Sequence, residues 1–187
     1  TRSGIASGTK QFTALGIGAL IDAGLLTLET TVGEINGRYA GFIHPTATIQ
    51  QLLSHTSGIF DYYDEEIIED FDNFFVDIPW YQLETPADYW PLFEGQTAKF
   101  APGERYAYSN GGYVFLGMLI EKISGKLYRK FIHETVLQPA GMLNSGFFAL
   151  NDLPANSANG YMANRQTTNI FIQPIRGGGD GGLFTTA

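Results

Sequence analysis

A long apolar segment near the start of the chain places the strongest constraint on its fold. Between Phe12 and Leu25 nearly every residue is apolar or small, and Gly24 stands where a helix can end in the left-handed conformation. A helix that is apolar on all sides is packed on all sides. The segment therefore predicts a buried helix that opens within residues 5–14 and around which the rest of the chain is organised.

Two residues at the front of this predicted helix have side chains suited to catalysis. Ser7 and Lys10 are three positions apart, so on a helix they share one face with their Cβ atoms about 6 Å apart. A serine hydroxyl needs a neighbouring base to act as a nucleophile, and a lysine amine can be that base where burial or nearby positive charge favours its neutral form. The alternative is that Ser7 only caps the helix, as serine commonly does.

Composition narrows the class of protein. The chain has 187 residues, 44% of them hydrophobic, which is enough for one domain with a real core. Its net charge of −8 argues against nucleic acid as a partner, because phosphate backbones need a basic surface. No apolar run reaches the length of a membrane span. Cysteine is absent, which excludes thiol chemistry, disulfides and cysteine metal sites but decides no compartment.

The remaining pattern predicts mostly short elements. Helices are expected where apolar residues recur at helical spacing between capping residues, and loops where polar or acidic residues dominate. In the first half of the chain we expect a turn and an extended piece over 26–35, a helix over 47–53 that starts near Thr48, and an acidic surface helix or loop over 61–73. The aromatic residues of 78–93 are expected to pack in the core and in loops; the minority interpretation is that one or two of these rings line a pocket. In the second half we expect helices over 113–124 and 127–137, the first ended by Gly125, and loops over 144–169.

Metal and nucleotide motifs are weak. Residues 177–182 match the G-x-G-x-x-G spacing of dinucleotide sites, but no acidic residue follows about 20 positions on, so a flexible turn is predicted. His55 lies in a polar turn closed by Gly58 and is predicted to be structural, with a catalytic base as the alternative. No two histidines form a metal-binding helical pair, so we expect neither a metal nor a cofactor; the histidines are His44, His55 and His133.

Tyr108 and Asn110 form a second candidate pair. A phenol beside an ammonium ionises more easily and can then shuttle protons, while an amide two residues on can orient a lysine or hold a substrate carbonyl. Taken alone this signal is weak, because tyrosine is usually part of a core and Asn-Gly-Gly is usually a turn.

Taken together, the motifs resemble those of the serine β-lactamase and penicillin-binding-protein superfamily. The Tyr-Ser-Asn form, in place of Ser-Asp-Asn, points to the branch of class C β-lactamases, D-alanyl-D-alanine carboxypeptidases and related esterases. The similarity runs from Gly4 to about Phe147 and resumes from Gly178 to Ala187. It rests on Ser7-x-x-Lys10, Lys10-Gln11-Phe12-Thr13-Ala14, Leu52-Leu53-Ser54-His55-Thr56-Ser57-Gly58, Pro102-Gly103, Tyr108-Ser109-Asn110, Glu121-Lys122-Ile123-Ser124-Gly125 and Pro139-Ala140-Gly141-Met142.

The resemblance implies an α/β (α+β) fold of the β-lactamase/transpeptidase type, with an antiparallel sheet flanked by helices and a helical subdomain. Residues 1–187 would form a single partial domain, covering mainly the nucleophile helix and the helical part. The family's first strands and its third motif, Lys-Thr-Gly or His-x-Gly on a later strand, would lie outside it. On this basis we expect residues 1–187 alone to be inactive and to expose sticky sheet edges.

The resemblance also implies a role for each site residue. Ser7 would attack a carbonyl and form an acyl-enzyme, Lys10 and Tyr108 would share the proton transfers, and Asn110 would position Lys10 or the substrate. The backbone N–H of Ser7 would be one oxyanion-hole donor, worth about 3 kcal/mol.

The implied partner is a small-molecule or peptide substrate, namely a D-Ala-D-Ala-like peptide, a β-lactam or an ester. We favour peptidase or esterase action over antibiotic resistance. The residues themselves fix no compartment, and the resemblance implies a periplasmic or secreted location. Two alternatives stay open. One is a non-catalytic penicillin-sensing or scaffold relative of the same fold, and the other is an unrelated Ser–Lys amidase.

Overall fold

The computed structural model describes residues 1–35 and 41–187. Its elements are short apart from two helices. In chain order they are β1 (Ser3–Gly4), the 3₁₀ turn η1 (Ala6–Thr9), α1 (Lys10–Asp22), α2 (Val32–Ile35), α3 (Ile49–Leu53), the 3₁₀ turns η3 (Phe71–Asn73), η4 (Trp80–Gln82) and η5 (Pro86–Tyr89), α4 (Trp90–Phe93), α5 (Asn110–Ser124), α6 (Tyr128–Ile132), the π-helical turn η6 (His133–Leu137), η7 (Asn169–Phe171) and β2 (Phe184–Thr185).

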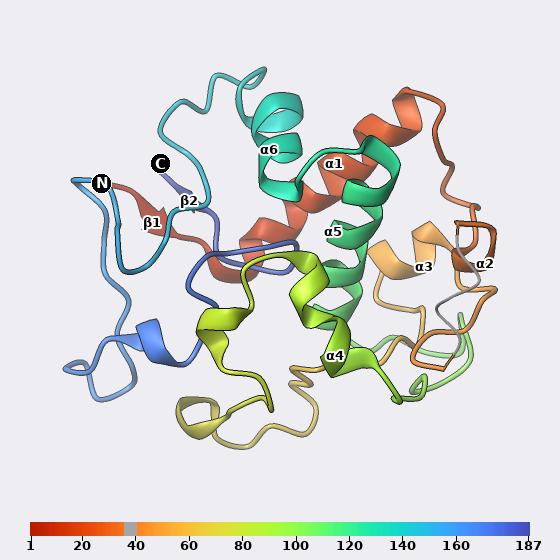
Figure 1. The fold of residues 1–187 in the computed structure, drawn as a ribbon, viewed down its shortest axis with the longest axis horizontal. Helices are drawn as coiled ribbons and strands as arrows, with labels where there is room; N and C mark the ends of the chain where they lie inside the picture. Colours follow the sequence, from red (N-terminus) through yellow and green to blue (C-terminus); the bar gives the residue numbers. More distant parts are fainter. Residues whose placement is uncertain (36–40) are drawn as a thin grey trace.

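Helix α5 stands at the centre of the molecule, with α1, α3 and α6 packed against it (Figure 1). The two strands come from opposite ends of the described chain and pair antiparallel, with Ser3 opposite Thr185 and Gly4 opposite Phe184. Helices together with a small antiparallel sheet agree with the α/β fold that the resemblance implies. The pairing of β1 with β2 brings residue 184 close to the turn that carries Ser7.

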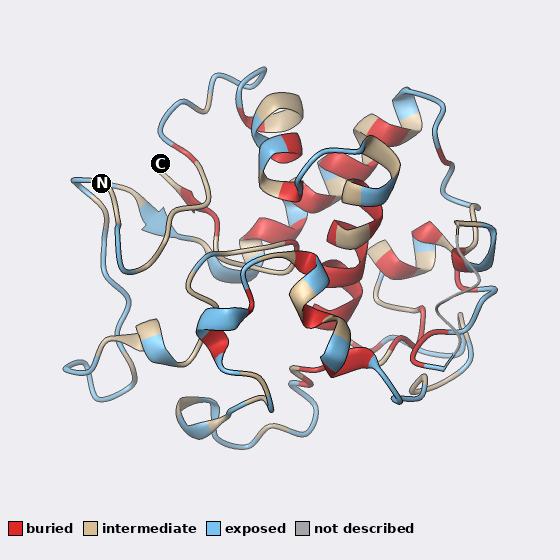
Figure 2. Cartoon of the chain, in the orientation of Figure 1, coloured by how far each residue is buried: buried red, intermediate tan, exposed pale blue. Residues whose placement is uncertain are grey.

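The helix buried on almost all sides is α5, and the prediction of such burial for α1 is wrong. Figure 2 shows buried residues along most of α5, whereas α1 is buried only in part. Ile17 and Leu20 of α1 are buried, but Leu15 is 57% exposed and Leu25, just beyond the helix, is 56% exposed. The helix itself is confirmed over Lys10–Asp22, and it packs on one side only, where α5, α6 and η6 lie.

The caps of α5 explain its limits. The Ser109 hydroxyl accepts a hydrogen bond from the Gly112 N–H at 2.9 Å, so the helix begins at Asn110, three residues before the predicted start. Gly125 ends it in the left-handed conformation with φ +68°, as predicted. At α3 the predicted start is also confirmed, because Thr48 forms a capping box with Gln51.

The expectation for residues 26–35 is wrong in part. Thr31 forms a single bridge with Thr48, but the chain then turns into the short helix α2 instead of continuing as an extended piece. The Glu34 carboxylate accepts hydrogen bonds from the N–H and the hydroxyl of Thr31, which closes this turn, and Val32 is fully buried beneath it.

The acidic segment 61–73 is a loop with one 3₁₀ turn, but it is not uniformly solvated. Asp61 is buried with 4% exposure, and Asp64 is buried beside Lys99, whose ammonium lies 2.6 Å from its carboxylate. Tyr62 is also buried. The acidic pattern therefore hides two carboxylates that hold structure together, which a sequence count of charges does not reveal.

Candidate active site

Ser7 and Lys10 meet at the start of α1, as their spacing predicts. Ser7 lies in η1 and is exposed, while Lys10 begins α1 and is only 6% exposed. The Lys10 Nζ lies 3.2 Å from the Ser7 Oγ. Ala6, directly before the serine, has φ +44°, a left-handed backbone uncommon outside glycine. Such strained positions cluster at functional sites, and here one fixes the direction in which the chain presents Ser7.

Lys10 has two further hydrogen-bond partners, both carbonyl oxygens. Its Nζ donates to the side-chain Oδ1 of Asn110 at 2.8 Å and to the main-chain oxygen of Asp180 at 2.6 Å. A neutral amine has two N–H groups and one lone pair. With both N–H groups given to the carbonyls, the lone pair of the neutral form points to the Ser7 hydroxyl, which is the arrangement a general base needs.

The Asn110 side-chain amide is oriented by the acceptors that its NH₂ group contacts. Its Nδ2 donates to the main-chain oxygen of Tyr63 at 3.0 Å and lies 3.3 Å from the Glu65 carboxylate. Because these acceptors require the NH₂ group on their side, the Oδ1 faces Lys10. The sequence left open whether Asn110 contacts Lys10 or a substrate, and in the structure its oxygen is on Lys10.

Tyr108 lies beside the same ammonium. The Lys10 Nζ is 4.8 Å from the centroid of the Tyr108 ring and 5.6 Å from that of Tyr113, both within the range of a cation–π contact. The His55 ring stacks on Tyr108 with its centroid 4.6 Å away. Tyr108, which lies almost a hundred residues from Lys10 in the sequence, is thus brought into the candidate site.

His55 has a structural role, as its surroundings in the sequence indicate. Its Nδ1 accepts a hydrogen bond from the Ser109 N–H at 3.1 Å, which fixes the backbone between Tyr108 and Asn110. Burial, and then the positive charge of Lys10, lower the pKa of His55 from 6.5 to about 4. The imidazole is therefore neutral at pH 7 and keeps this acceptor available.

The glycine-rich segment 177–182 is part of the site: it turns as predicted, with a hydrogen bond from the Gly178 N–H to the Gly181 oxygen at 2.9 Å, but it is packed against α1 and α5. The main-chain oxygen of Gly179 accepts a hydrogen bond from the Thr13 hydroxyl at 2.6 Å, and the Leu183 N–H donates to the Thr9 hydroxyl at 2.9 Å. A Cβ atom on Gly179 would lie 2.2 Å from the main-chain oxygen of Tyr113 in α5. Only glycine permits this close approach to α5, so the loop is packed and not free.

A signal for this packing was present in the sequence. Thr9, Lys10 and Thr13 occupy positions i, i+1 and i+4, so they lie along one edge at the start of α1. All three bind the segment 179–183. Sequence reasoning assigned no role of their own to Thr9, Thr13 and Asp180.

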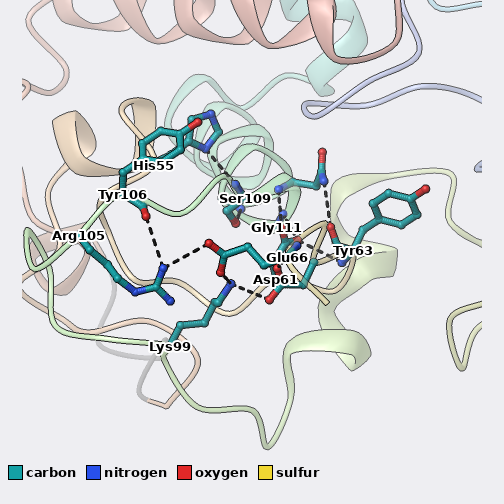
Figure 3. Close-up of polar contacts among 12 residues, drawn as sticks. His55, Asp61, Tyr63, Glu66, Lys99, Arg105, Tyr106, Ser109 and Gly111 are labelled. Carbon is teal, nitrogen blue, oxygen red and sulfur yellow. Dashed lines mark hydrogen bonds and ion pairs between the residues drawn. The ribbon is translucent and has the colours of Figure 1, made fainter. Parts of the chain in front are cut away.

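Sequence reasoning also missed the residues that hold the site from the acidic loop (Figure 3). The Asp61 carboxylate accepts hydrogen bonds from the N–H groups of Asn110 and Gly111, each at 2.8 Å, and from Tyr63 at 3.1 Å. Burial raises the pKa of Asp61 from 3.8 to about 6, against the opposing effect of these hydrogen bonds. The neighbouring Tyr62 hydroxyl donates to the Asp180 carboxylate at 2.6 Å.

Ser7 lies at the wall of a cleft of about 310 Å³. This volume is at the lower end of the range for small-molecule sites. The minority interpretation of the aromatic segment 78–93, that one or two of its rings line a pocket, holds for Trp80 and Tyr89. Tyr62, Tyr63, Glu65, Asn110 and Asp180 also line the cleft.

Within residues 1–35 and 41–187 no group of three or more histidine, aspartate or glutamate side chains is arranged to hold a metal ion. No helix in these ranges combines the length and the apolar character required to cross a membrane.

Comparison with known proteins places this geometry in a family. The sequence profile described as Beta-lactamase matches residues 1–187. Penicillin-binding protein 4* of Bacillus subtilis is 37% identical over 140 residues, which are 74% of this chain and 29% of that protein. The chain belongs to the beta-lactamase family.

Solved structures agree with this assignment. A penicillin-binding protein from Bacillus halodurans superposes with a TM-score of 0.91 at 43% identity, over 100% of this chain and 57% of that one. The octameric penicillin-binding protein homologue from Pyrococcus abyssi gives a TM-score of 0.79 at 34% identity, over 100% of this chain and 42% of that one. The chain thus has the β-lactamase-like fold and spans less than a third of the Bacillus subtilis relative's length.

Proposed function

We propose that the protein is a serine hydrolase that cleaves amide or ester bonds through an acyl-enzyme on Ser7. The contact that carries the proposal is the one between the Lys10 Nζ and the Ser7 Oγ at 3.2 Å, with the other two Lys10 contacts on carbonyl oxygens. A serine whose neighbouring amine has its lone pair directed at the hydroxyl is an activated nucleophile.

The reaction would proceed in two stages. In acylation the Ser7 Oγ bonds to the substrate carbonyl carbon while its proton passes to Lys10, and the leaving amine or alcohol takes a proton as its bond breaks. In deacylation a water molecule attacks the acyl carbon, and the Ser7 Oγ regains a proton as it leaves. Lys10 and the Tyr108 phenol share these transfers, and Asn110 keeps Lys10 in place.

The oxyanion of each tetrahedral intermediate needs donors close to Ser7. The main-chain N–H of Ser7 is our candidate for one of them, because it belongs to the turn η1 that lies at the cleft. A donor of this kind contributes about 3 kcal/mol to transition-state stabilisation. The substrate class we propose comprises D-Ala-D-Ala-like peptides, β-lactams and esters, which all present a reactive carbonyl.

The test is a covalent adduct on the complete protein. Incubation with benzylpenicillin, followed by mass spectrometry of the intact protein and of its peptides, should find one acyl group, on Ser7. The Ser7→Ala variant should form no adduct, whereas Ser54→Ala, which changes an exposed serine elsewhere, should be labelled like the wild type. Hydrolysis of a D-Ala-D-Ala peptide or a p-nitrophenyl ester would identify the turnover substrate.

The alternative is a non-catalytic relative that only binds penicillin or serves as a scaffold. A stable adduct on Ser7 without turnover of any peptide or ester would favour the penicillin-sensing form. Absence of any adduct, with ester hydrolysis unchanged in Ser7→Ala, would refute the role of Ser7.

A further inference from the structure

Both carbonyl partners of Lys10 are held by one short segment of the acidic loop, Asp61-Tyr62-Tyr63. This segment lies in neither α1 nor α5, and the proposed reaction does not use it. Its three consecutive residues each make a hydrogen bond to an element that contacts Lys10.

The first of these elements is the start of α5. The buried Asp61 carboxylate divides its two oxygens between the N–H groups of Asn110 and Gly111, so each amide has its own acceptor at 2.8 Å. The main-chain oxygen of Tyr63 takes the Asn110 side-chain NH₂. Asn110 is thereby fixed at both its backbone and its side chain, and these contacts direct its Oδ1 to Lys10.

The second element is the glycine-rich loop. The Tyr62 hydroxyl donates to the Asp180 Oδ2 at 2.6 Å, while the main-chain oxygen of Asp180 accepts from Lys10. Burial raises the pKa of Tyr62 well above its ordinary value of 10.0, so the phenol stays protonated and remains a donor. Tyr62 therefore holds the residue that supplies the other carbonyl.

We propose that Asp61 and Tyr62 are positioning residues that set the direction of the Lys10 lone pair, by fixing the two carbonyl oxygens to which Lys10 donates. Neither side chain hydrogen-bonds Lys10 or Ser7 directly in the described structure. Their effect on rate rests on the proposed hydrolase function, whereas their effect on the geometry of Asn110 and Asp180 does not.

The hold of Asp61 on the start of α5 depends on pH, because burial and nearby charge shift the pKa of its carboxyl group. The Asp180 carboxylate of the glycine-rich loop raises its pKa, in addition to the larger effect of burial. The phenol of Tyr62 faces it from its own segment, and Lys10 lies beyond Asn110 on the side of α1. Protonation of Asp61 near pH 6 would remove one of the two carboxylate acceptors and weaken the hold on Asn110 and Gly111.

The hold of Asp61 on the Asn110 and Gly111 backbone is the geometric part of the proposal, and it is tested by the amide signals of the complete protein. In ¹⁵N NMR spectra recorded from about pH 4 to about pH 8, the Asn110 and Gly111 amides should titrate together with a midpoint near pH 6. Asp61→Asn should abolish this titration, and Asp77→Asn, which changes an exposed aspartate, should leave it unchanged. A titration that persists in Asp61→Asn would overturn the assignment, whatever the activity of the protein.

The rate effect is tested by acylation kinetics. In Asp61→Asn an NH₂ group faces one of the two helix amides, and in Tyr62→Phe only a hydroxyl is lost, so the second variant has the smaller risk of misfolding. Each should slow acylation of Ser7 by benzylpenicillin about 10- to 100-fold, because a base displaced by a fraction of an ångström loses its alignment. Tyr81→Phe and Asp77→Asn, both at exposed positions, are the matched controls.

The pH profile separates positioning from general damage. The wild-type acylation rate should fall on the acid side with a component near pH 6, and Asp61→Asn should lack that component. Labelling of both variants at the wild-type rate with an unchanged profile would overturn the inference and leave the hydrolase function intact. If the wild type forms no adduct, the hydrolase function fails, and the amide titration alone decides the geometric part.

Discussion

Replacing Thr13 with valine should reveal how strongly the glycine-rich loop is held to α1. Thr13 is fully buried and its hydroxyl has two partners, the Gly179 main-chain oxygen at 2.6 Å and the Tyr128 hydroxyl at 2.7 Å. Thr13 has a single hydroxyl proton, which it gives to Gly179, so Tyr128 must be the donor in the second bond. Valine keeps the shape and removes both bonds.

The expected cost follows from the two groups left without partners. The Gly179 oxygen and the Tyr128 hydroxyl would both remain buried and unpaired. Each such group costs about 1–3 kcal/mol, so Thr13→Val should lower the free energy of unfolding by about 2–6 kcal/mol. Tyr128→Phe alone removes one bond but leaves Thr13 paired with Gly179, and should cost about 1 kcal/mol.

A double-mutant cycle makes the reasoning testable. In Thr13→Val/Tyr128→Phe the orphaned phenol is gone, so the double variant should be more stable than Thr13→Val by about 1 kcal/mol. Urea unfolding followed by circular dichroism gives the four free energies, provided that the slope with urea is unchanged. An unaltered midpoint in Thr13→Val, or costs that simply add in the double variant, would refute this account of the buried hydroxyl pair.

Two further predictions concern pH and backbone space. Because the pKa of His55 is lower in the folded protein, at about 4, than in the unfolded chain, at about 6.5, the unfolded chain binds the additional proton in that interval. The His55 contribution to stability should therefore be lost as the pH drops from about 6.5 to about 4, while the raised pKa of Asp61 acts in the opposite direction over much of the same interval. The His55 part is the difference in pH dependence between the wild type and His55→Asn, where asparagine tolerates the left-handed backbone; urea midpoints of both proteins at the two ends of the interval decide this. Gly18→Ala should raise the free energy of unfolding by about 1 kcal/mol, since a Cβ at Gly18 meets nothing within 4 Å and alanine favours the helix. Gly111→Ala should lower the free energy of unfolding by about 1–3 kcal/mol, because a Cβ at residue 111 would lie 2.6 Å from the Phe60 main-chain oxygen. Thermal unfolding of the two variants measures this, and the same change in stability for both alanine substitutions would contradict the two glycine predictions.

The sequence predicted those features that depend on neighbouring residues. The three-residue spacing of Ser7 and Lys10, the capping of α3 by Thr48 and the end of α5 at Gly125 follow from local backbone geometry and hold in the structure. The contact of Lys10 with Asn110, a hundred positions away, came from the resemblance to a family. Local reasoning could offer only that an amide near a lysine is chemically useful.

The features that local reasoning missed depend on which segments meet in space. Asp61 reads as a solvated charge in an acidic stretch, whereas in the fold its carboxylate is buried against the first turn of α5 and accepts hydrogen bonds from two amides there. Gly179 reads as part of a flexible run, although the close approach of α5 requires a glycine there. Leu15 and Ile17 belong to one apolar stretch, and which of the two is buried depends on the side where α5 packs.

The contacts of Lys10 fit both halves of the proposed acyl transfer. Within residues 1–35 and 41–187 no carboxylate lies within ion-pair distance of its Nζ; its three hydrogen-bond partners are neutral oxygens. As an ammonium it donates to all three, and as an amine it donates to two and accepts from Ser7, so no partner is stranded when the proton moves. Asp180 presents its main-chain oxygen to Lys10 and its carboxylate to Tyr62. A carboxylate in the place of that oxygen would favour the ammonium form alone and oppose proton release, so the proposed role of Lys10 as a base depends on the orientation of Asp180 as well as on its position.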